Sequence, residues 1–231
     1  MNKSLIIPII LAGVFSASVE AKVSPKEAAK LHVELTPMGA ERAGNKEGTI
    51  PAWSGGIQKI PQDYKPGEHH VDPYADEEPM LTITGKNYQN YAEKLSEGQI
   101  AMLKQYPDYK LKVYPTHRSA SFPQKIYDFS VKNATSAELT QDGAGLRNAA
   151  VGVPFPIPAN GLEAIWNHLT RYRGEAIKRE YVQVSPQVDG SFNPVKFEQE
   201  SLQYYAQEHP EKENFLFLYK QRITSPSSMA G

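Results

Sequence analysis

Residues Ala149–Gly174 have the sequence AAVGVPFPIPANGLEAIWNHLTRYRG and join a proline-rich run to a segment with strong helix signals. Pro154, Pro156 and Pro158 alternate with apolar residues, and proline lacks the N–H group that a central strand must donate. The run therefore predicts an extended, polyproline-like or sheet-edge segment. It is either a stiff connector whose apolar side chains pack into the core, or the rim of an apolar cavity.

A helix is predicted over the residues that follow, from Asn160 to Arg173. Asn160 is a suitable N-cap, and Glu163 three residues later completes a capping box. Gly174 is expected to end the helix in the left-handed conformation. The apolar residues recur at helical spacing and form one stripe, which needs a sheet or another helix to cover it: Leu162, Ile165, Trp166, Leu169 and Tyr172.

Beyond this helix the apolar period changes to two, which is typical of strands. Residues 176–188 and 192–206 are predicted to form a hairpin around Asp189–Gly190, and residues 215–223 a third strand. We expect one face of this meander to be apolar, to curl towards a barrel or half-barrel, and to meet the helix stripe. The outer edge of the third strand is expected to be open, as in a truncated sheet or one that pairs with another chain.

The N-terminus has the pattern of an exported protein. A short positive start is followed by an apolar stretch over residues 5–15 and by Val19-Glu20-Ala21, so a signal peptide cleaved after Ala21 is predicted. No cysteine follows that could carry a lipid anchor. We therefore expect a periplasmic protein, with residues 22–231 forming a single domain that begins with a long loop-rich, helical region.

Composition and motifs argue against several functions. The formal net charge is −1 and there is no basic stripe, so nucleic acid is not an expected partner. His69 and His70 lie among carboxylates, but adjacent histidines on an extended chain point to opposite sides, and a solvated acidic loop is the simpler interpretation. His168 and His117 have no visible partner, and a GxSxG motif is absent. We expect no enzyme, no catalytic or metal-ligating residues and no cofactor; a hydrolase is the less favoured alternative.

Two stretches resemble a known family. These are Glu34–Gly56, ELTPMGAERAGNKEGTIPAWSGG, and Val151–Gly174. Both are similar to the bacterial periplasmic domain-of-unknown-function family 1329, which is often described as outer-membrane lipoprotein-sorting-like. Members are about twice as long as this chain, which therefore resembles an N-terminal portion of a longer domain.

The resemblance implies an α+β fold similar to the LolA and LppX carriers, in which a strongly curved antiparallel sheet, an incomplete barrel, packs on a helix around an apolar cavity. It also implies work with an export permease of the resistance-nodulation-division type or with an outer-membrane protein, and possible association with the outer membrane. No catalytic residues are carried over, because the family has none established.

A carrier of a lipid or other hydrophobic small molecule needs shape and apolar lining rather than a motif. The candidate lining residues are Phe155, Ile157, Leu162, Ile165, Trp166 and Leu169. Ordinary core packing is the competing interpretation for each of them. The alternative function is a protein-interaction module of the cell envelope that uses the open sheet edge.

Overall fold

The computed structural model describes residues 23–208 and 216–226. The predicted signal peptide, residues 1–21, lies outside the described residues, and the single domain over 22–231 stays a prediction. The helices are α1 (Pro25–Ala28), α2 (Glu97–Gln105), α3 (Gln124–Ser136) and α4 (Gly161–Leu169), with 3-10 helices η1 (Ala29–His32), η2 (Tyr88–Lys94) and η3 (Tyr204–Ala206). The strands are β1 (Leu81–Thr84), β2 (Lys110–Val113), β3 (Glu138–Leu139), β4 (Leu146–Arg147), β5 (Ala176–Pro186), β6 (Phe192–Leu202) and β7 (Leu218–Ser225).

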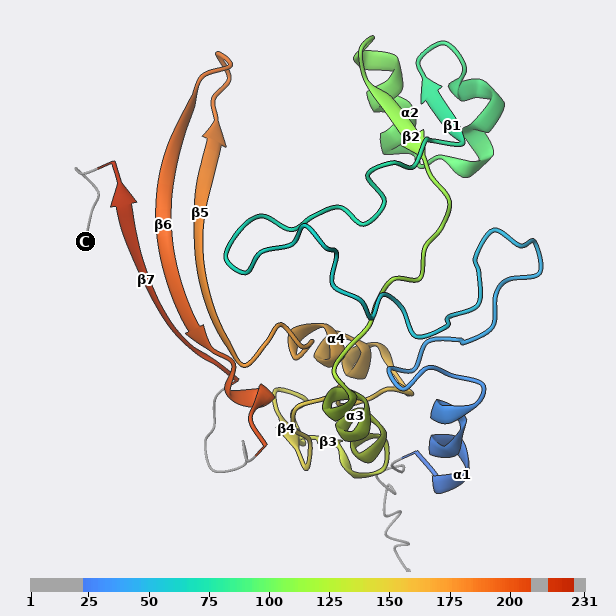
Figure 1. The fold of residues 1–231 in the computed structure, drawn as a ribbon, viewed down its shortest axis with the longest axis vertical. Coiled ribbons are helices and arrows are strands. Elements are labelled where there is room, and N and C mark those ends of the chain that lie inside the picture. The colour runs from blue at the N-terminus through green and yellow to red at the C-terminus, as the bar shows by residue number, and fades with distance from the viewer. Residues whose placement is uncertain (1–22, 209–215, 227–231) are drawn as a thin grey trace, which may run out of the picture.

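The strands form three antiparallel sheets among the described residues, β1-β2, β3-β4 and β5-β6-β7, and none of them closes into a barrel. The mixed α+β class expected from the sequence is therefore confirmed. Figure 1 shows the β5-β6-β7 sheet bowed along its length and standing beside the helical body, while β1, β2 and α2 form a separate small lobe. Within the described residues, none of the helices is both long and apolar enough to span a membrane.

The helical body has two small apolar clusters. One joins Ala28 and Leu31 of the N-terminal helices to Ala134 of α3. The other joins Ala137, which follows α3, to Phe155 and Trp166. The extended run predicted from the prolines lies between these clusters, since Phe155 belongs to the second and Ile157 packs against the first.

Polar side chains of α3 hold the beginning of this extended run by its backbone. The Ser130 hydroxyl accepts from the N–H of Val153 at 2.9 Å and donates to the carbonyl of Ile126 at 2.7 Å. The Asn133 amide donates to the carbonyls of Ala150 and Val153 at 3.0 and 3.3 Å. Ser130 and Asn133 are themselves buried, so these bonds satisfy backbone groups that water does not reach.

The run is also tied to the foot of the large sheet. The N–H of Val151 donates to the carbonyl of Tyr205 at 2.8 Å, and the Tyr205 hydroxyl donates to the carbonyl of Gly152 at 2.9 Å. Burial raises the pKa of this hydroxyl above its ordinary value, so it stays a donor. Val151 is buried at a φ of 64°, a conformation that β-branched residues rarely adopt. The hydrogen bonds of Val151 and Gly152 to Tyr205 hold the backbone in this conformation.

Two glycines permit close backbone approaches to this run. A Cβ on Gly152 would lie 2.4 Å from the backbone nitrogen of Ser130. A Cβ on Gly39, in the turn after Thr36, would clash with the carbonyl oxygen of Pro156, because the two atoms would be only 1.7 Å apart. Residues 36–40 therefore pack directly on the proline run.

The long loop Glu34–Gly56 is held down by side chains. Trp53 donates its indole N–H to the carbonyl of Ala120 at 3.0 Å and meets Tyr127 edge to face. The Arg118 guanidinium donates to the carbonyls of Glu41, at 2.6 Å, and of Arg42, at 3.1 Å. These contacts fix residues 41–57 against the segment that leads into α3.

The large sheet confirms the predicted hairpin and corrects its details. Residues 176–186 pair in register with 192–202, and Asp189 accepts from both the N–H and the hydroxyl of Ser191 in the turn. The predicted second strand is too long, because the chain turns into η3 at Tyr204.

The expected division of the sheet into an apolar and a charged face is also only approximate. One face carries Tyr181 stacked on Phe197, but Arg179 and Gln199 lie beside them. The other face carries exposed ion pairs such as Glu198–Arg222.

Candidate functional site

Helix α4 begins as predicted but ends early. Asn160 accepts from the N–H of Glu163 at 3.0 Å, and the Glu163 carboxylate accepts from the N–H of Ala159 at 2.7 Å. The helix ends at Leu169 rather than Arg173, and Gly174 has a φ of 103° four residues beyond the capping Thr170. The predicted helix boundary is therefore wrong, because residues 170–174 form a connection to β5 without regular secondary structure.

The buried face of α4 is set by polar contacts as well as by apolar ones. Trp166 is buried and donates its indole N–H to the carbonyl of Gly143 at 3.0 Å. Asn167 accepts from the N–H of Phe155 at 2.9 Å and donates to the carbonyl of the same residue at 2.7 Å. Thr170 is buried as well and donates to the carbonyl of Trp166. The face of the helix that carries these three residues is the one turned to the core.

As a result, three of the five residues of the predicted α4 stripe point away from the core, although Trp166 is buried as predicted. Leu162, Ile165 and Leu169 recur at three and four residues, so they share one helical face. Their side chains are 46%, 56% and 51% exposed. The expectation that this stripe packs against the large sheet is wrong; we name these three residues the α4 stripe. A contiguous exposed apolar stripe beside a polar rim is typical of an interaction or ligand site.

The six residues predicted to line a cavity are thus divided between three environments. Phe155 and Trp166 lie in one core cluster, and Ile157 is partly buried against the other. Leu162, Ile165 and Leu169 form the exposed stripe. The structure does not bring the six together around one space.

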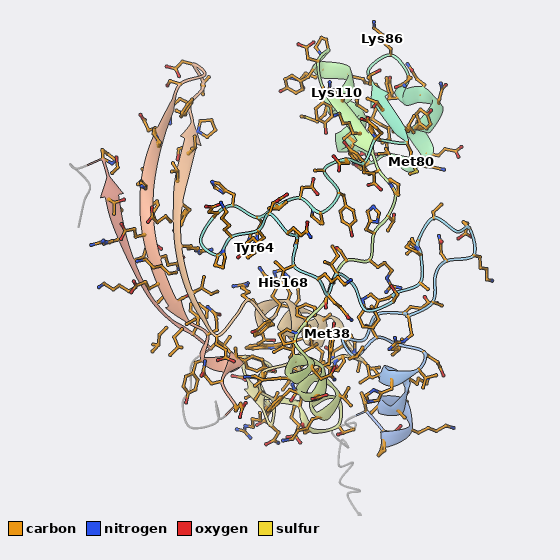
Figure 2. The ribbon with its side chains drawn as sticks, viewed as in Figure 1. Met38, Tyr64, Met80, Lys86, Lys110 and His168 are labelled. Atoms are coloured by element: carbon orange, nitrogen blue, oxygen red, sulfur yellow. The ribbon has the colours of Figure 1, made fainter. Side chains whose placement is uncertain are left out.

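Charged residues gather at the C-terminal end of the stripe. Arg171 donates to the carbonyl of His168 at 2.8 Å, and its Nη1 lies 3.2 Å from the Nε2 of that histidine. Partial burial lowers the pKa of the Arg173 guanidinium, and the positive charges of Arg171 and Arg179 lower it further. Figure 2 shows His168 on the side of α4 turned away from α3.

A second constellation lies where the two connections to the small lobe meet. The Nε2 of His117 lies 2.9 and 3.0 Å from the two carboxylate oxygens of Glu77, and its ring stacks on Tyr74 with centroids 3.9 Å apart. The sequence gives no signal for this pair, because forty residues separate its members. It joins the two chain segments that carry the lobe.

Metal ligation finds no support in residues 23–208 and 216–226, where no group of three His, Asp or Glu side chains is placed to hold an ion. His70 instead stacks on Tyr64. A shallow hollow of about 610 Å³ lies at the foot of the large sheet, between residues of β5, β6 and β7. None of the six predicted lining residues contributes to its wall.

The fold and site define an α+β protein in which an open antiparallel sheet stands beside a helix with an exposed apolar stripe. The chain belongs to the family described as protein of unknown function DUF1329, whose model matches residues 82–231. An uncharacterised protein of Pseudomonas aeruginosa is 45% identical over 229 residues, which are 96% of this chain and 50% of that relative. The chain thus spans about half the length of the curated relative it matches. No solved structure matches it.

Proposed function

We propose that this chain is part of a binding or carrier protein for a lipid or another hydrophobic ligand, and not an enzyme. The observation that carries the proposal is the α4 stripe, Leu162, Ile165 and Leu169, each about half exposed although the helix itself is well capped and anchored. Leaving three large aliphatic side chains half exposed to water is unfavourable. Covering the exposed half of each side chain would contribute about 1 kcal/mol to the binding free energy. A ligand chain would supply that cover.

The large sheet supports the same function. Its strands are eleven, eleven and eight residues long and are bowed, and none of its described faces is covered by a helix over its full length. A curved sheet beside an apolar helix is the arrangement of LolA-like and LppX-like carriers, and a longer protein with further strands would enclose the ligand more completely. The likeness to those carriers is part of the proposal.

The proposed setting is the periplasm, with the signal peptide cleaved after Ala21. The proposed partners are a permease of the resistance-nodulation-division type or an outer-membrane protein, which would deliver or receive the ligand. These proposals rest on the N-terminal sequence pattern and on the family resemblance.

The ligand itself tests the proposal. The protein is purified from the cell envelope, extracted with organic solvent, and the extract is analysed by mass spectrometry, while a fluorescent fatty acid measures uptake by the emptied protein. We expect a stoichiometric hydrophobic compound or saturable uptake. An empty protein that also fails to take up the probe would refute the carrier function.

Variants locate the binding surface. Replacing Leu162, Ile165 and Leu169 together with serine is expected to weaken uptake at least tenfold, because three apolar contacts of about 1 kcal/mol each are lost. Val182→Ser with Val184→Ser is the matched control, since these β5 side chains are 52% and 49% exposed. Thermal unfolding checks that both variants fold. If the two variants lost probe uptake to the same extent, the ligand would not bind at the α4 stripe.

The alternative is an interaction module that binds a partner strand. In the described sheet β6 lies between β5 and β7, so each of these outer strands has one edge without a neighbouring strand. An edge of this kind pairs readily with another chain. Sedimentation tests it: concentration-dependent association of the 231-residue chain, absent from a longer form, favours edge pairing, and a monomer at all concentrations argues against it.

A further inference from the structure

Strand β7 has an outer edge that none of the described strands occupies. In the large sheet β6 lies between β5 and β7, and Figure 1 shows β7 on the side of the sheet turned away from the small lobe. The N–H and C=O groups of alternate β7 residues point to this edge, where they can pair with an added strand. Residues 218–222 of the strand are all exposed.

The register of the sheet places charged side chains of one face in rows. Lys178 of β5, Glu200 of β6 and Lys220 of β7 lie opposite one another in that order. In the next row Arg222 lies opposite Glu198 and donates to its carboxylate from Nε at 2.8 Å. Each row therefore ends at the outer edge of β7 with a cation.

The cation that ends the first row lacks an ion-pair partner. A carboxylate oxygen of Glu200 lies 3.9 Å from the Nζ of Lys178, and no described carboxylate lies within ion-pair distance of Lys220. Opposite charges that face each other across strands stabilise a sheet, and like charges destabilise it. A strand added to β7 is therefore favoured when it carries carboxylates opposite Lys220 and Arg222.

The same face is apolar at the foot of the strand. Leu218 lies opposite Leu202, and both line the hollow of about 610 Å³ at the foot of the sheet. Side chains two positions apart in a strand share a face, so Leu218, Lys220 and Arg222 point to the same side. An antiparallel strand that matches all three has two acidic residues, two positions apart, and an apolar residue two positions after the second.

We propose that the outer edge of β7 binds an antiparallel strand of a partner protein with this pattern of two acidic residues and one apolar residue. The inference rests on the alternative function given above, the binding of a partner strand, and adds the chemical class of that strand. Main-chain hydrogen bonds supply the affinity, and the three alternate side chains supply the specificity.

The test measures the binding of short fluorescent peptides to the 231-residue chain by fluorescence anisotropy. One peptide has glutamate at both acidic positions, leucine at the apolar position, and threonine and valine elsewhere. In the second peptide lysine replaces both glutamates. We expect the glutamate peptide to bind about tenfold more tightly, with a difference that shrinks as salt is added.

Backbone pairing is tested with two further glutamate peptides, each N-methylated at alternate residues along one of its two edges. A methylated nitrogen cannot donate a hydrogen bond to the sheet. We therefore expect the peptide whose methyl groups face β7 to lose binding, and the other to keep it.

Two lysines opposite the same glutamate provide a matched pair of variants. In Lys220→Gln the preference for the glutamate peptide is expected to fall about threefold, because one of the two charge pairs at the edge is lost. Lys178→Gln removes the lysine on the other side of Glu200, in β5, and is expected to keep the full preference. Thermal unfolding checks that both variants fold.

The outcomes separate the two proposals. If none of the peptides binds, the partner-strand function itself fails. If the glutamate and lysine peptides bind equally, or if Lys178→Gln lowers the preference as much as Lys220→Gln does, that function stands and the acidic pattern at β7 is overturned. Strand addition is overturned if both N-methylated peptides bind like the parent peptide. A dimer of the chain that the glutamate peptide does not dissociate would assign the edge to a second copy and also overturn the proposal.

Discussion

At the scale of single residues, this protein depends on polar side chains that hold backbone. Ser130 and Asn133 of α3, with Asn167 of α4, bond to the main chain of residues 150–155 rather than to other side chains. A run with three prolines cannot join a sheet ladder, so its remaining buried N–H and C=O groups need such partners. These residues are polar, so hydrophobic periodicity does not identify them, and the sequence therefore predicts none of them as buried.

Gly152 shows how closely this backbone is packed. In Gly152→Ala the new Cβ would meet the nitrogen of Ser130 at 2.4 Å and the carbonyl oxygen of Ile126 at 2.8 Å, and α3 would have to move. We expect a loss of about 3 kcal/mol in the free energy of unfolding, measured by urea denaturation. Gly161→Ala, where a Cβ meets nothing within 4 Å, is the control and is expected to be nearly neutral. Similar losses of unfolding free energy in both variants would show that the close packing at Gly152 is not the cause of the destabilisation.

At the scale of elements, α4 and the large sheet are stabilised differently. Helix α4 is held by its N-cap and by the contacts of Trp166 and Asn167. The sheet instead depends on register and on cross-strand pairs, since most of its side chains are exposed. Glu198 and Arg222 lie opposite each other in β6 and β7, and Arg222 Nε donates to the carboxylate at 2.8 Å.

This pair predicts a pH dependence. The hydrogen bond from Arg222 holds the pKa of the Glu198 carboxyl below its ordinary value of 4.5. A carboxyl with a depressed pKa in the folded state stabilises the fold above its unfolded pKa, and this contribution is lost as the pH falls through the folded value. Glu198→Gln is therefore expected to lower Tm slightly at neutral pH, and the difference from wild type should shrink as the pH falls below 4.5 and vanish once the folded carboxyl is protonated.

Glu200→Gln is the matched control for that experiment, because Glu200 lies in the same strand but its oxygen is 3.9 Å from Lys178. Its effect on Tm is expected to be smaller at neutral pH. A Tm difference for Glu198→Gln that persists unchanged in acid would contradict the assigned cause.

At the scale of the whole molecule, the small lobe and the large sheet both extend from the helical body (Figure 1). Residues 57–80 form one connection to the lobe and contain no helix or strand. The second connection, residues 114–122, is held to the carbonyls of Glu41 and Arg42 by Arg118, while the His117–Glu77 pair ties the two connections to each other. The two connections therefore differ in how firmly they are held.

Limited proteolysis can measure that difference. Trypsin is expected to cut after Lys59, which is exposed and precedes the 75% exposed Ile60, well before it cuts after Arg118. The guanidinium of Arg118 is bound to the carbonyls of residues 41 and 42, so the enzyme reaches it only after local opening. Mass spectrometry of early digests gives the order. Cleavage at both sites with equal rates would show that the second connection opens as freely as the first.

The sequence alone determined the local features. It predicted the cap at Asn160 and the hairpin at Asp189–Gly190, and the structure confirms both of them. These features depend on bonds between residues a few positions apart, so their cause lies within a short window of chain.

Tertiary structure alone decided which side of α4 faces the core. The apolar period predicts a buried stripe that includes Trp166, and Trp166 is buried, but Leu162, Ile165 and Leu169 of the same stripe are exposed. Turning Asn167 inward instead satisfies two backbone groups of Phe155 that would otherwise lose their partners. With Asn167 on the inner side, Leu162, Ile165 and Leu169 lie on the exposed side of the helix. The pairing of His117 with Glu77 across forty residues was decided in the same way, because long-range contacts leave no periodicity in the chain.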